Sequence, residues 1–363
     1  MQSIAPSKLF KGDSAWDSAK TIIPSICSRP IILGRSKNTQ MIRSKIFSDL
    51  QNLGGLNIFS TVLTYDCCEK DLRKIEEFSY SNSCDCIIAC GGGKVLDAGK
   101  LIADRLKIPC ITVPTSAATC AGWTSLSNIY SKEGRFIKDI PLSSCPDILI
   151  FDHRFIKTAP KRTLSSGIAD ALAKWYESSI TSGSDKDGMT QQAVQMARVL
   201  RDQLFIDGCS ALNDTSSYSW KNIINGCGLT AGMIGGLGGA KCRTAAAHAL
   251  HNGLTQLEFK DKPLHGELVG VGILIQLKLE ELMMNNNLAL QSIKQLTIFM
   301  KKINLPISID QLNLKSLSKE SLMQACDFAC KKDSDIYLLP FEINKEILFE
   351  AIVKTNLKNL SIV

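Results

Sequence analysis

The chain has 363 residues, and its 42 Lys and Arg against 35 Asp and Glu give a formal net charge of +7. Hydrophobic residues make up 45% and charged residues 21%, a globular composition that excludes a disordered or fibrous protein. The length exceeds what one hydrophobic core usually supports, so we expect two domains.

In the first half of the chain, short apolar segments alternate with helical patterns. Strands are predicted at 30–33, 57–64, 86–89, 108–113 and 147–151, with helices such as 71–78 and 96–106 between them. Strands with few alternating polar residues are buried on both faces, and helical connections permit parallel crossovers. We therefore predict a Rossmann-like, doubly wound α/β domain over residues 1–155, with its ligand beyond the carboxyl ends of the strands.

Beyond residue 155, long amphipathic helical patterns dominate. They cover 164–179, 191–204, 245–251, 267–284 and 288–303. This pattern predicts an all-α domain over residues 156–363.

The fourteen cysteines include no CxxC pair. That spacing argues against structural zinc, and the chain is long for a disulfide scaffold. We predict that most of the cysteines are small buried thiols in a reducing compartment, the cytoplasm.

Membrane and nucleic-acid partners are not expected. Residues 1–19 have no continuous apolar segment, which argues against a signal peptide. The uncharged run 223–240 contains seven glycines, so it reads as a buried helix and Gly-rich turn and not as a membrane span. Positive charge is spread along the chain without a block of five like charges, which indicates a solvated surface.

A glycine-rich motif joins a predicted strand to a predicted helix. Gly91, Gly92, Gly93 and Lys94 follow the strand at 86–89. Glycines at such a junction let the backbone approach a pyrophosphate, and the helix N-terminus supplies amide donors and positive potential. The motif is neither GxGxxG nor a Walker sequence, so a tight turn is the alternative, with Lys94 as a surface lysine.

Three of the four histidines fall within eighteen residues of each other. His248 and His251 share a helix face, and His265 precedes the next helical pattern. Two imidazoles with one carboxylate are typical of a catalytic zinc or iron site. Asp170, in an apolar helical segment, is the candidate carboxylate because an unpaired Asp is costly to bury. The alternative is a pair of satisfied core histidines with Asp170 as a capping residue; His153 stands alone and is predicted to be structural.

Five segments carry motifs that run in order through about half of the chain. They are GGGKVLDAGK (91–100), PTSAATCAGWTSLSNIY (114–130), GIADALAKWYE (167–177), AAAHALHNGLT (245–255) and LHGELVGVGIL (264–274). Together they resemble the iron-containing, glycerol dehydrogenase-like alcohol dehydrogenases. The sequence pattern AATCA-W-T-LS and the GMIGGLG segment are most similar to the bacterial hydroxycarboxylate dehydrogenases, which reduce 2-oxo acids. The resemblance implies a dehydroquinate synthase-like fold with a helical metal-binding domain.

The resemblance also implies roles for particular residues. It implies that Asp170, His248 and His265 bind one divalent metal, Zn²⁺ or Fe²⁺, and that His251 lies near the substrate, where it could relay a proton. It implies nucleotide cofactor contacts from Gly92, Gly93, Lys94, Asp97, Thr115, Ala118, Thr124, Leu126 and Tyr130.

Two positions depart from the family pattern. Cys120 stands where glycerol dehydrogenases carry an Asp that contacts the polyol, so this substrate-side position argues against glycerol and removes repulsion toward an anionic substrate. Arg35 stands where NAD-using members carry an Asp. Because an Arg suits a ribose 2′-phosphate, we predict that NADP(H) is preferred over NAD(H). The alternative is that Arg35 is a solvated surface charge.

The sequence therefore predicts a metal-dependent oxidoreductase that transfers hydride between NAD(P)H and a small carbonyl or alcohol. The favoured substrate is a 2-oxo acid or its 2-hydroxy acid. Lys241 and Arg243, just before the His helix, are candidates to meet a substrate carboxylate. The alternatives are a glycerol dehydrogenase, a dehydroquinate synthase-like lyase, and a non-enzymatic cofactor- or nucleic-acid-binding protein. Because family members commonly form dimers or larger assemblies, we expect a homo-oligomer.

Overall fold

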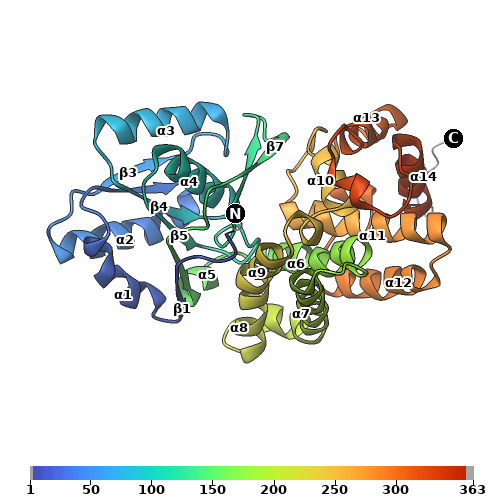
Figure 1. Cartoon of the computed structure of the whole chain (residues 1–363), viewed down its shortest axis with the longest axis horizontal. Helices are drawn as coiled ribbons and strands as arrows, with labels where there is room; N and C mark the ends of the chain where they lie inside the picture. The colour runs from blue at the N-terminus through green and yellow to red at the C-terminus, as the bar shows by residue number, and fades with distance from the viewer. Residues whose placement is uncertain (1–2, 357–363) are drawn as a thin grey trace. The chain divides into compact units, whose positions relative to one another are not determined.

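In the computed structural model, which describes residues 3–356, the chain divides into two compact units, Met1–Pro160 and Lys161–Val363 (Figure 1). The division falls a few residues after the predicted boundary at 155. The reason is that α5 (His153–Lys157) packs on the last strand of the first unit.

A six-stranded parallel sheet forms the centre of the first unit, in the order β1-β8-β5-β4-β2-β3. Its strands are β1 (Lys8–Gly12), β2 (Pro30–Gly34), β3 (Phe59–Val62), β4 (Cys86–Gly91), β5 (Cys110–Pro114) and β8 (Ile148–Asp152). Every residue of β2, β4, β5 and β8 is buried, as expected for a sheet covered on both faces. The five predicted strands and the doubly wound α/β class are confirmed.

Helices cover both faces of this sheet. On one face, α1 (Ala15–Ala19) and α2 (Gln40–Leu53) pack their apolar residues against the strands in one core cluster. On the other face lie α3 (Glu69–Ser81) and α4 (Gly93–Leu106), as Figure 1 shows. A Cβ at Gly99 of α4 would lie 2.4 Å from the Cβ of Ala89, so glycine there lets α4 pack directly on β4.

Two features of the first unit escaped prediction. The edge strand β1 has two exposed lysines, an exposed Leu9 and a partly buried Phe10, so its composition does not indicate a strand. The second is an antiparallel hairpin of β6 (Leu126–Tyr130) and β7 (Phe136–Pro141). His153 is buried with its ring edge-on to Phe151, which fits the structural role predicted for it.

The second unit is helical through its described residues, apart from an isolated bridge between Phe259 and Leu314. Its α-helices are α6 (Lys161–Ser182), α7 (Gly188–Asn213), α8 (Tyr218–Asn225), α9 (Ala231–Gly238), α10 (Ala246–Leu254), α11 (His265–Met284), α12 (Asn287–Lys302), α13 (Lys319–Ala329) and α14 (Lys345–Asn356). The all-α prediction is confirmed, although α8, α9, α13 and α14 were not placed individually.

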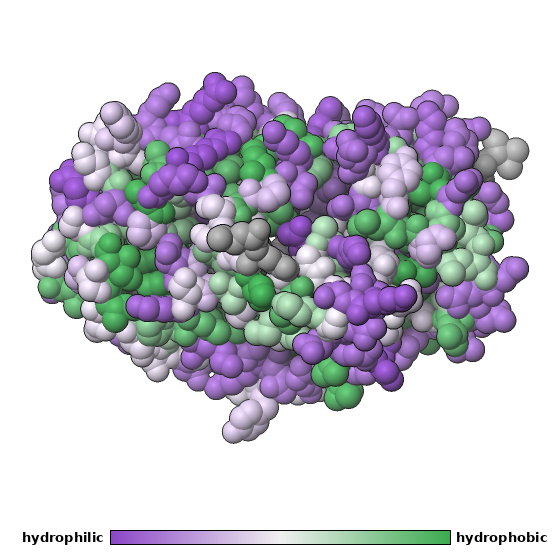
Figure 2. Space-filling model, viewed as in Figure 1, coloured by the Kyte–Doolittle hydropathy of each residue, from purple (hydrophilic) through white to green (hydrophobic). Residues whose placement is uncertain are grey.

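The uncharged run 223–240 forms the end of α8, a π-turn at Gly226–Thr230 and α9. Among the residues that the structure describes, no helix is long and apolar enough to cross a membrane. Hydrophilic and hydrophobic residues are interspersed over the face drawn in Figure 2. All fourteen cysteines are free thiols, and most of them are buried, as predicted.

The buried helix α11 carries an acidic side chain in its interior. Gln276 Nε2 donates a hydrogen bond to Glu280 Oε1 at 3.2 Å. Burial nevertheless raises the pKa of Glu280 from its usual 4.5 to about 7. The folded protein therefore retains a proton on Glu280 between pH 4.5 and pH 7 that the unfolded chain has lost, so this group's contribution to stability falls as the pH rises through 7.

Glu280→Gln should raise the free energy of unfolding at pH 8, because the neutral amide avoids burying a carboxylate. The gain should be about 2 kcal/mol larger at pH 8 than at pH 5, as measured by urea denaturation at both values. The matched control is Glu281→Gln, since the neighbouring Glu281 is ion-paired with Lys278 and partly exposed. A gain for Glu280→Gln that is the same at both pH values would contradict the assignment.

Candidate metal centre and nucleotide loop

The helices α6 and α11 approach closely where α11 begins. Gly266 N donates to Ser166 Oγ at 3.0 Å, and a Cβ on Gly266 would lie 1.8 Å from the carbonyl oxygen of Ser166. Arg162 of α6 adds a bidentate ion pair to the buried Glu267, with N–O distances of 2.6 and 2.7 Å. These contacts fix His265, the first residue of α11, beside the turn of α6 that follows Ser166.

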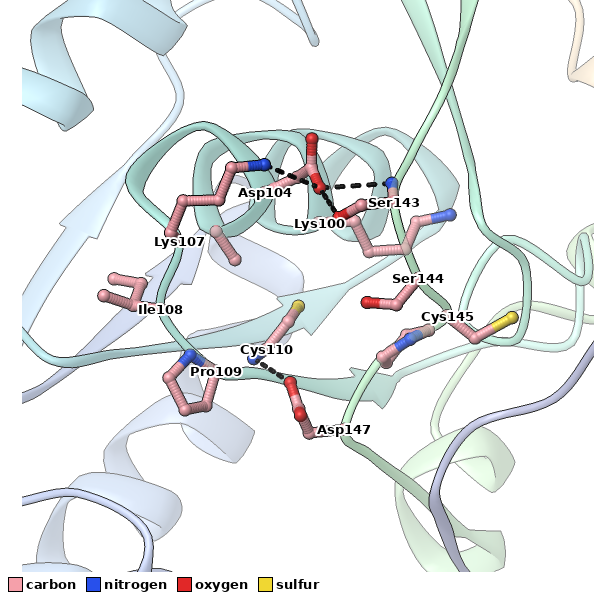
Figure 3. Close-up of a pocket in the computed structure, with 12 residues that line it drawn as sticks. Lys100, Asp104, Lys107, Ile108, Pro109, Cys110, Ser143, Ser144, Cys145 and Asp147 are labelled. Carbon is pink, nitrogen blue, oxygen red and sulfur yellow. Dashed lines mark hydrogen bonds and ion pairs between the residues drawn. The ribbon is translucent and has the colours of Figure 1, made fainter. Parts of the chain in front are cut away.

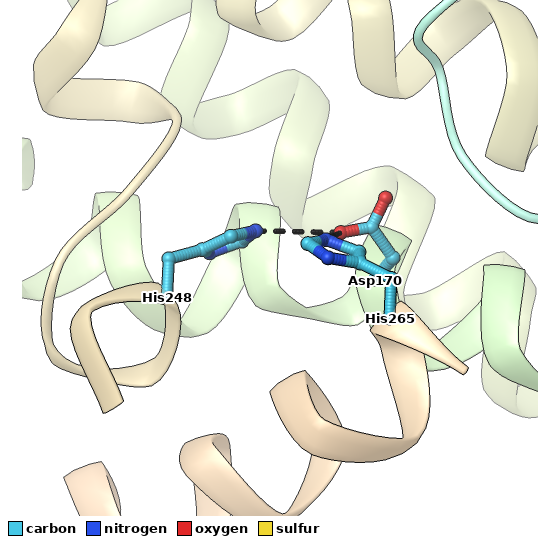
Figure 4. Close-up of side chains that lie close together, drawn as sticks. All are labelled: Asp170, His248 and His265. Carbon is cyan, nitrogen blue, oxygen red and sulfur yellow. Dashed lines mark hydrogen bonds and ion pairs between the residues drawn. The ribbon is translucent and has the colours of Figure 1, made fainter. Parts of the chain in front are cut away.

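The structure brings the three predicted metal ligands together (Figure 4). Asp170 Oδ1 lies 3.1 Å from His265 Nε2 and 3.4 Å from His248 Nε2. One ligand atom from each residue lies within 4.8 Å of the others, and Asp170 and His248 are buried. Two imidazole nitrogens and one carboxylate oxygen at this spacing fit a divalent ion such as Zn²⁺ or Fe²⁺.

A fourth side chain, Glu177, orients one of these residues and was missed in the sequence. Its Oε2 lies 2.6 Å from His248 Nδ1, and its Oε1 accepts hydrogen bonds from the backbone nitrogens of Ala245 and His248 at 2.7 and 3.0 Å. Glu177 has no solvent exposure. By holding Nδ1, it leaves His248 Nε2 directed at Asp170, the arrangement common behind metal-bound histidines. The signal that could have found it is its spacing of seven from Asp170 on one helix face.

The predicted proton relay, His251, contacts the cluster through His265. His251 Nε2 lies 2.9 Å from His265 Nδ1, and His251 Nδ1 lies 2.9 Å from Asn252 Oδ1. If His265 uses Nε2 toward Asp170, its Nδ1–H donates to His251 Nε2, and His251 then donates its own Nδ1–H to Asn252. His251 is 3% exposed, so this chain of hydrogen bonds is internal.

The charges of the cluster shift the pKa values of its members. Burial alone would lower the pKa of His248, but the charge of Glu177 and hydrogen bonds to Asp170 and Glu177 outweigh it and raise that pKa to about 9. Burial alone would raise the pKa of Asp170, but His265, His248 and Lys174 hold it well below its usual value. Burial, followed by repulsion from His265 and His248, keeps the pKa of His251 well below normal.

In the first unit, the predicted phosphate loop lies between β4 and α4. Gly92 precedes the helix, which begins at Gly93. Thr115 N, just after β5, donates to Gly91 O at 3.0 Å. A Cβ on Gly93 would lie 3.0 Å from Thr119 Oγ1, so a larger residue would press on the loop that carries Ala118 and the half-buried Cys120. The N-terminus of α4 is thus available to an anion at the carboxyl end of the sheet.

A buried carboxylate, Asp66, joins two of the predicted cofactor residues. Arg35 Nη2 lies 3.1 Å from Asp66 Oδ1, and Lys94 pairs with Asp66 Oδ2. The Lys94 ammonium also lies over the ring of Tyr130, 4.9 Å from its centroid. Arg35, Asp66 and Lys94 follow β2, β3 and β4, which are adjacent in the sheet. The polar residue after the predicted strand 57–64 was the available signal for Asp66.

Three other predicted cofactor residues surround Lys100, a buried lysine of α4. Lys100 Nζ donates to Thr124 O at 3.0 Å, to Thr124 Oγ1 at 3.1 Å and to Leu126 O. Asp97 Oδ1 lies 3.2 Å from the same ammonium. This network fastens the start of β6 to α4, so the carbonyl oxygens of Thr124 and Leu126 face Lys100.

A pocket of about 310 Å³ in the first unit lies beside the amino end of β5, with Lys100 among the residues that line it (Figure 3). Hydrogen bonds from Ser143 N to Asp104 and from Cys110 N to Asp147 brace its wall. The pocket contains none of the predicted site residues.

In the second unit, Lys241 is exposed and ion-paired with Asp185 at 3.0 Å, so its charge is directed to that carboxylate.

Comparison with known proteins places these motifs in one family. Residues 6–153 match the family model described as iron-containing alcohol dehydrogenase. The chain is 43% identical to an uncharacterized oxidoreductase of Synechocystis over 97% of this chain and 91% of the relative. It is 32% identical to hydroxycarboxylate dehydrogenase A of Escherichia coli over 79% of each chain. The chain belongs to the iron-containing alcohol dehydrogenase family. It is therefore an oxidoreductase of the alcohol and glycerol dehydrogenase type.

Solved structures of the family share the fold. The crystal structure of glycerol dehydrogenase from Schizosaccharomyces pombe matches with a TM-score of 0.83 at 26% identity, covering 98% of this chain and 90% of that one. The predicted dehydroquinate synthase-like fold is confirmed by this likeness.

Glu177→Gln should weaken binding of a divalent ion by roughly 10- to 100-fold. The amide orients His248 less strongly, and the substitution removes the negative charge next to its Nδ1. Competition between the protein and a fluorescent chelator for Zn²⁺ measures the affinity. Glu281→Gln on α11 serves as the control, since Glu281 pairs with Lys278 outside the cluster. An unchanged Zn²⁺ affinity in Glu177→Gln would show that Glu177 does not support a metal ligand.

Proposed function

We propose that this family member transfers hydride between NADP(H) and a 2-oxo acid or its 2-hydroxy acid, with a divalent ion at Asp170, His248 and His265. The observation that carries the proposal is the set of two imidazoles and one carboxylate within 4.8 Å, with Asp170 and His248 buried and Glu177 behind His248. The similarity to hydroxycarboxylate dehydrogenase A of E. coli also supports it.

The side chains of the centre have separate tasks in this proposal. A bound divalent ion supplies Lewis acidity toward a carbonyl oxygen and stabilises negative charge that develops there. Asp170, His248 and His265 hold the ion, and Glu177 orients His248. His251 holds a proton at Nδ1 against Asn252 and accepts one at Nε2 from His265, so it connects the centre to a hydrogen-bonded path for protons.

The NADP(H) preference rests on Arg35. Its side chain is 44% exposed, and the ion pair with Asp66 uses Nη2, so other guanidinium N–H groups can face a 2′-phosphate. Asp66 keeps the guanidinium beside the carboxyl end of β2, where a residue that contacts the ribose 2′ position selects between NAD(H) and NADP(H).

The homo-oligomeric state stays a prediction.

The second candidate function is oxidation of glycerol, which the likeness to the S. pombe enzyme favours. Cys120 argues against it, because a thiol stands at the substrate-side position where glycerol dehydrogenases carry the Asp that contacts the polyol. A substrate panel of 2-oxo acids, aldehydes and polyols with each cofactor separates the two. A lyase of the dehydroquinate synthase type would instead release phosphate without net consumption of NADPH.

His265→Ala should abolish both tight metal binding and turnover, because it removes a ligand and the contact to His251. Metal content of the purified protein and initial rates with pyruvate and NADPH test this together. His153→Gln, which changes the histidine outside the cluster, should retain both. Full activity of His265→Ala after treatment with a chelator would rule out the metal-dependent mechanism.

Arg35→Asp should raise the KM for NADPH, since the change replaces a phosphate partner with a repelling carboxylate beside Asp66. The measurement is the KM for NADPH and for NADH in the wild type and the variant. Lys11→Asp makes the same change of charge on the exposed edge strand β1 and should alter neither value. An unchanged KM for NADPH in Arg35→Asp, or equal turnover of both cofactors by the wild type, would contradict the predicted preference.

A further inference from the structure

A buried lysine, Lys174, shares a face of α6 with two acidic residues of the centre. It lies four residues after Asp170 and three before Glu177, so the three side chains project from neighbouring turns. Lys174 is only 5% exposed. Its ammonium donates to the carbonyl oxygen of Arg243 at 3.0 Å, on the segment that leads into α10 and His248.

The ammonium of Lys174 has donors to spare. A lysine carries three N–H groups, and the hydrogen bond to Arg243 O uses one. Within residues 3–356, no carboxylate oxygen lies within ion-pair distance of its Nζ, in contrast to Lys241, which pairs with Asp185. Burying a charge without a paired counter-ion is costly. A site that retains a buried, unpaired ammonium is therefore expected to bind an anion with it.

The charge balance of the centre points the same way. Asp170 and Glu177 contribute two negative charges, and a divalent ion would cancel them. Lys174 then leaves one positive charge in a buried region. A substrate with a single carboxylate neutralises it, whereas a neutral polyol or aldehyde does not.

We propose that Lys174 is the specificity-determining cation for the substrate, and that its ammonium binds the carboxylate of a 2-oxo or 2-hydroxy monoacid. This inference rests on the proposed function and deepens it. Lys241, one of the two cations suggested by the sequence, is exposed and paired with Asp185, whereas Arg243, the other, accepts the hydrogen bond of Lys174 through its backbone carbonyl.

The test compares an anionic substrate with a neutral one of the same shape. Pyruvate and its amide, pyruvamide, present the same ketone, but only pyruvate carries a charge. Lys174→Gln removes the charge and keeps an N–H donor for Arg243 O, and Lys174→Arg keeps the charge. The control is Lys241→Gln. Metal content is measured for every variant, so that a lost ion is distinguished from a lost substrate contact.

Lys174→Gln should raise the KM for pyruvate at least roughly 30-fold while leaving the KM for pyruvamide within a few-fold, because one partner of a desolvated charge pair is lost. Lys174→Arg should retain a preference for pyruvate, and Lys241→Gln should behave as the wild type. An unchanged ratio of the two KM values in Lys174→Gln, with its metal retained, would overturn the role of Lys174 while leaving the proposed function intact.

Equilibrium binding separates this inference from the proposed function itself. Oxamate, an unreactive analogue of pyruvate, is titrated by calorimetry into the zinc-loaded protein. If no carbonyl compound is turned over, the proposed function fails, yet oxamate binding that is lost in Lys174→Gln still supports an anion site at Lys174. Equal binding in both proteins, or none in the wild type, overturns it.

Discussion

The organisation of the second unit depends on two carboxylates that α6 buries. Asp170 and Glu177 are 4% and 0% exposed, and an isolated buried carboxylate would be strongly destabilising. The surrounding structure compensates them with imidazoles from α10 and α11 and with backbone N–H groups at the start of α10. Holding these groups in place requires close helix packing, which Gly266 permits where α11 meets α6. The imidazoles that stabilise these buried carboxylates are also metal donors. The same side chains therefore stabilise the fold and form the candidate metal site.

The first unit meets a related constraint at the carboxyl end of its sheet. Arg35 and Lys94 follow adjacent strands and would repel each other, but both pair with the buried Asp66. The glycines before α4 leave the helix N-terminus open beside this cluster. An anionic nucleotide would thus meet cations that are already positioned, which reduces the entropy lost when it binds.

The sequence predicted the elements whose pattern reflects burial on both faces, and missed those set by tertiary context. Strands β2, β4, β5 and β8 are short, nearly continuous apolar runs between helical patterns, so composition and length were sufficient. The edge strand β1 is defined by pairing with β8 and not by its Lys-rich composition. Among site residues, residue type and spacing indicated Asp170, His248 and His265 as candidates, and the resemblance assigned them as metal ligands. Glu177, Lys174 and Asp66 were missed because their roles depend on which partner faces them across the fold. The spacing of Glu177 from Asp170 and the position of Asp66 after a strand were signals, but neither identifies that partner.

The central claim is that the donors from α6, α10 and α11 bind one divalent ion. X-ray absorption spectroscopy of the zinc-loaded protein tests it most directly, since the protein also offers fourteen free thiols as rival ligands. We expect nitrogen and oxygen neighbours at about 2.0–2.2 Å, with outer-shell scattering from two imidazoles and no sulfur. A sulfur neighbour at about 2.3 Å, or an oxygen-only shell without imidazole scattering, would contradict it.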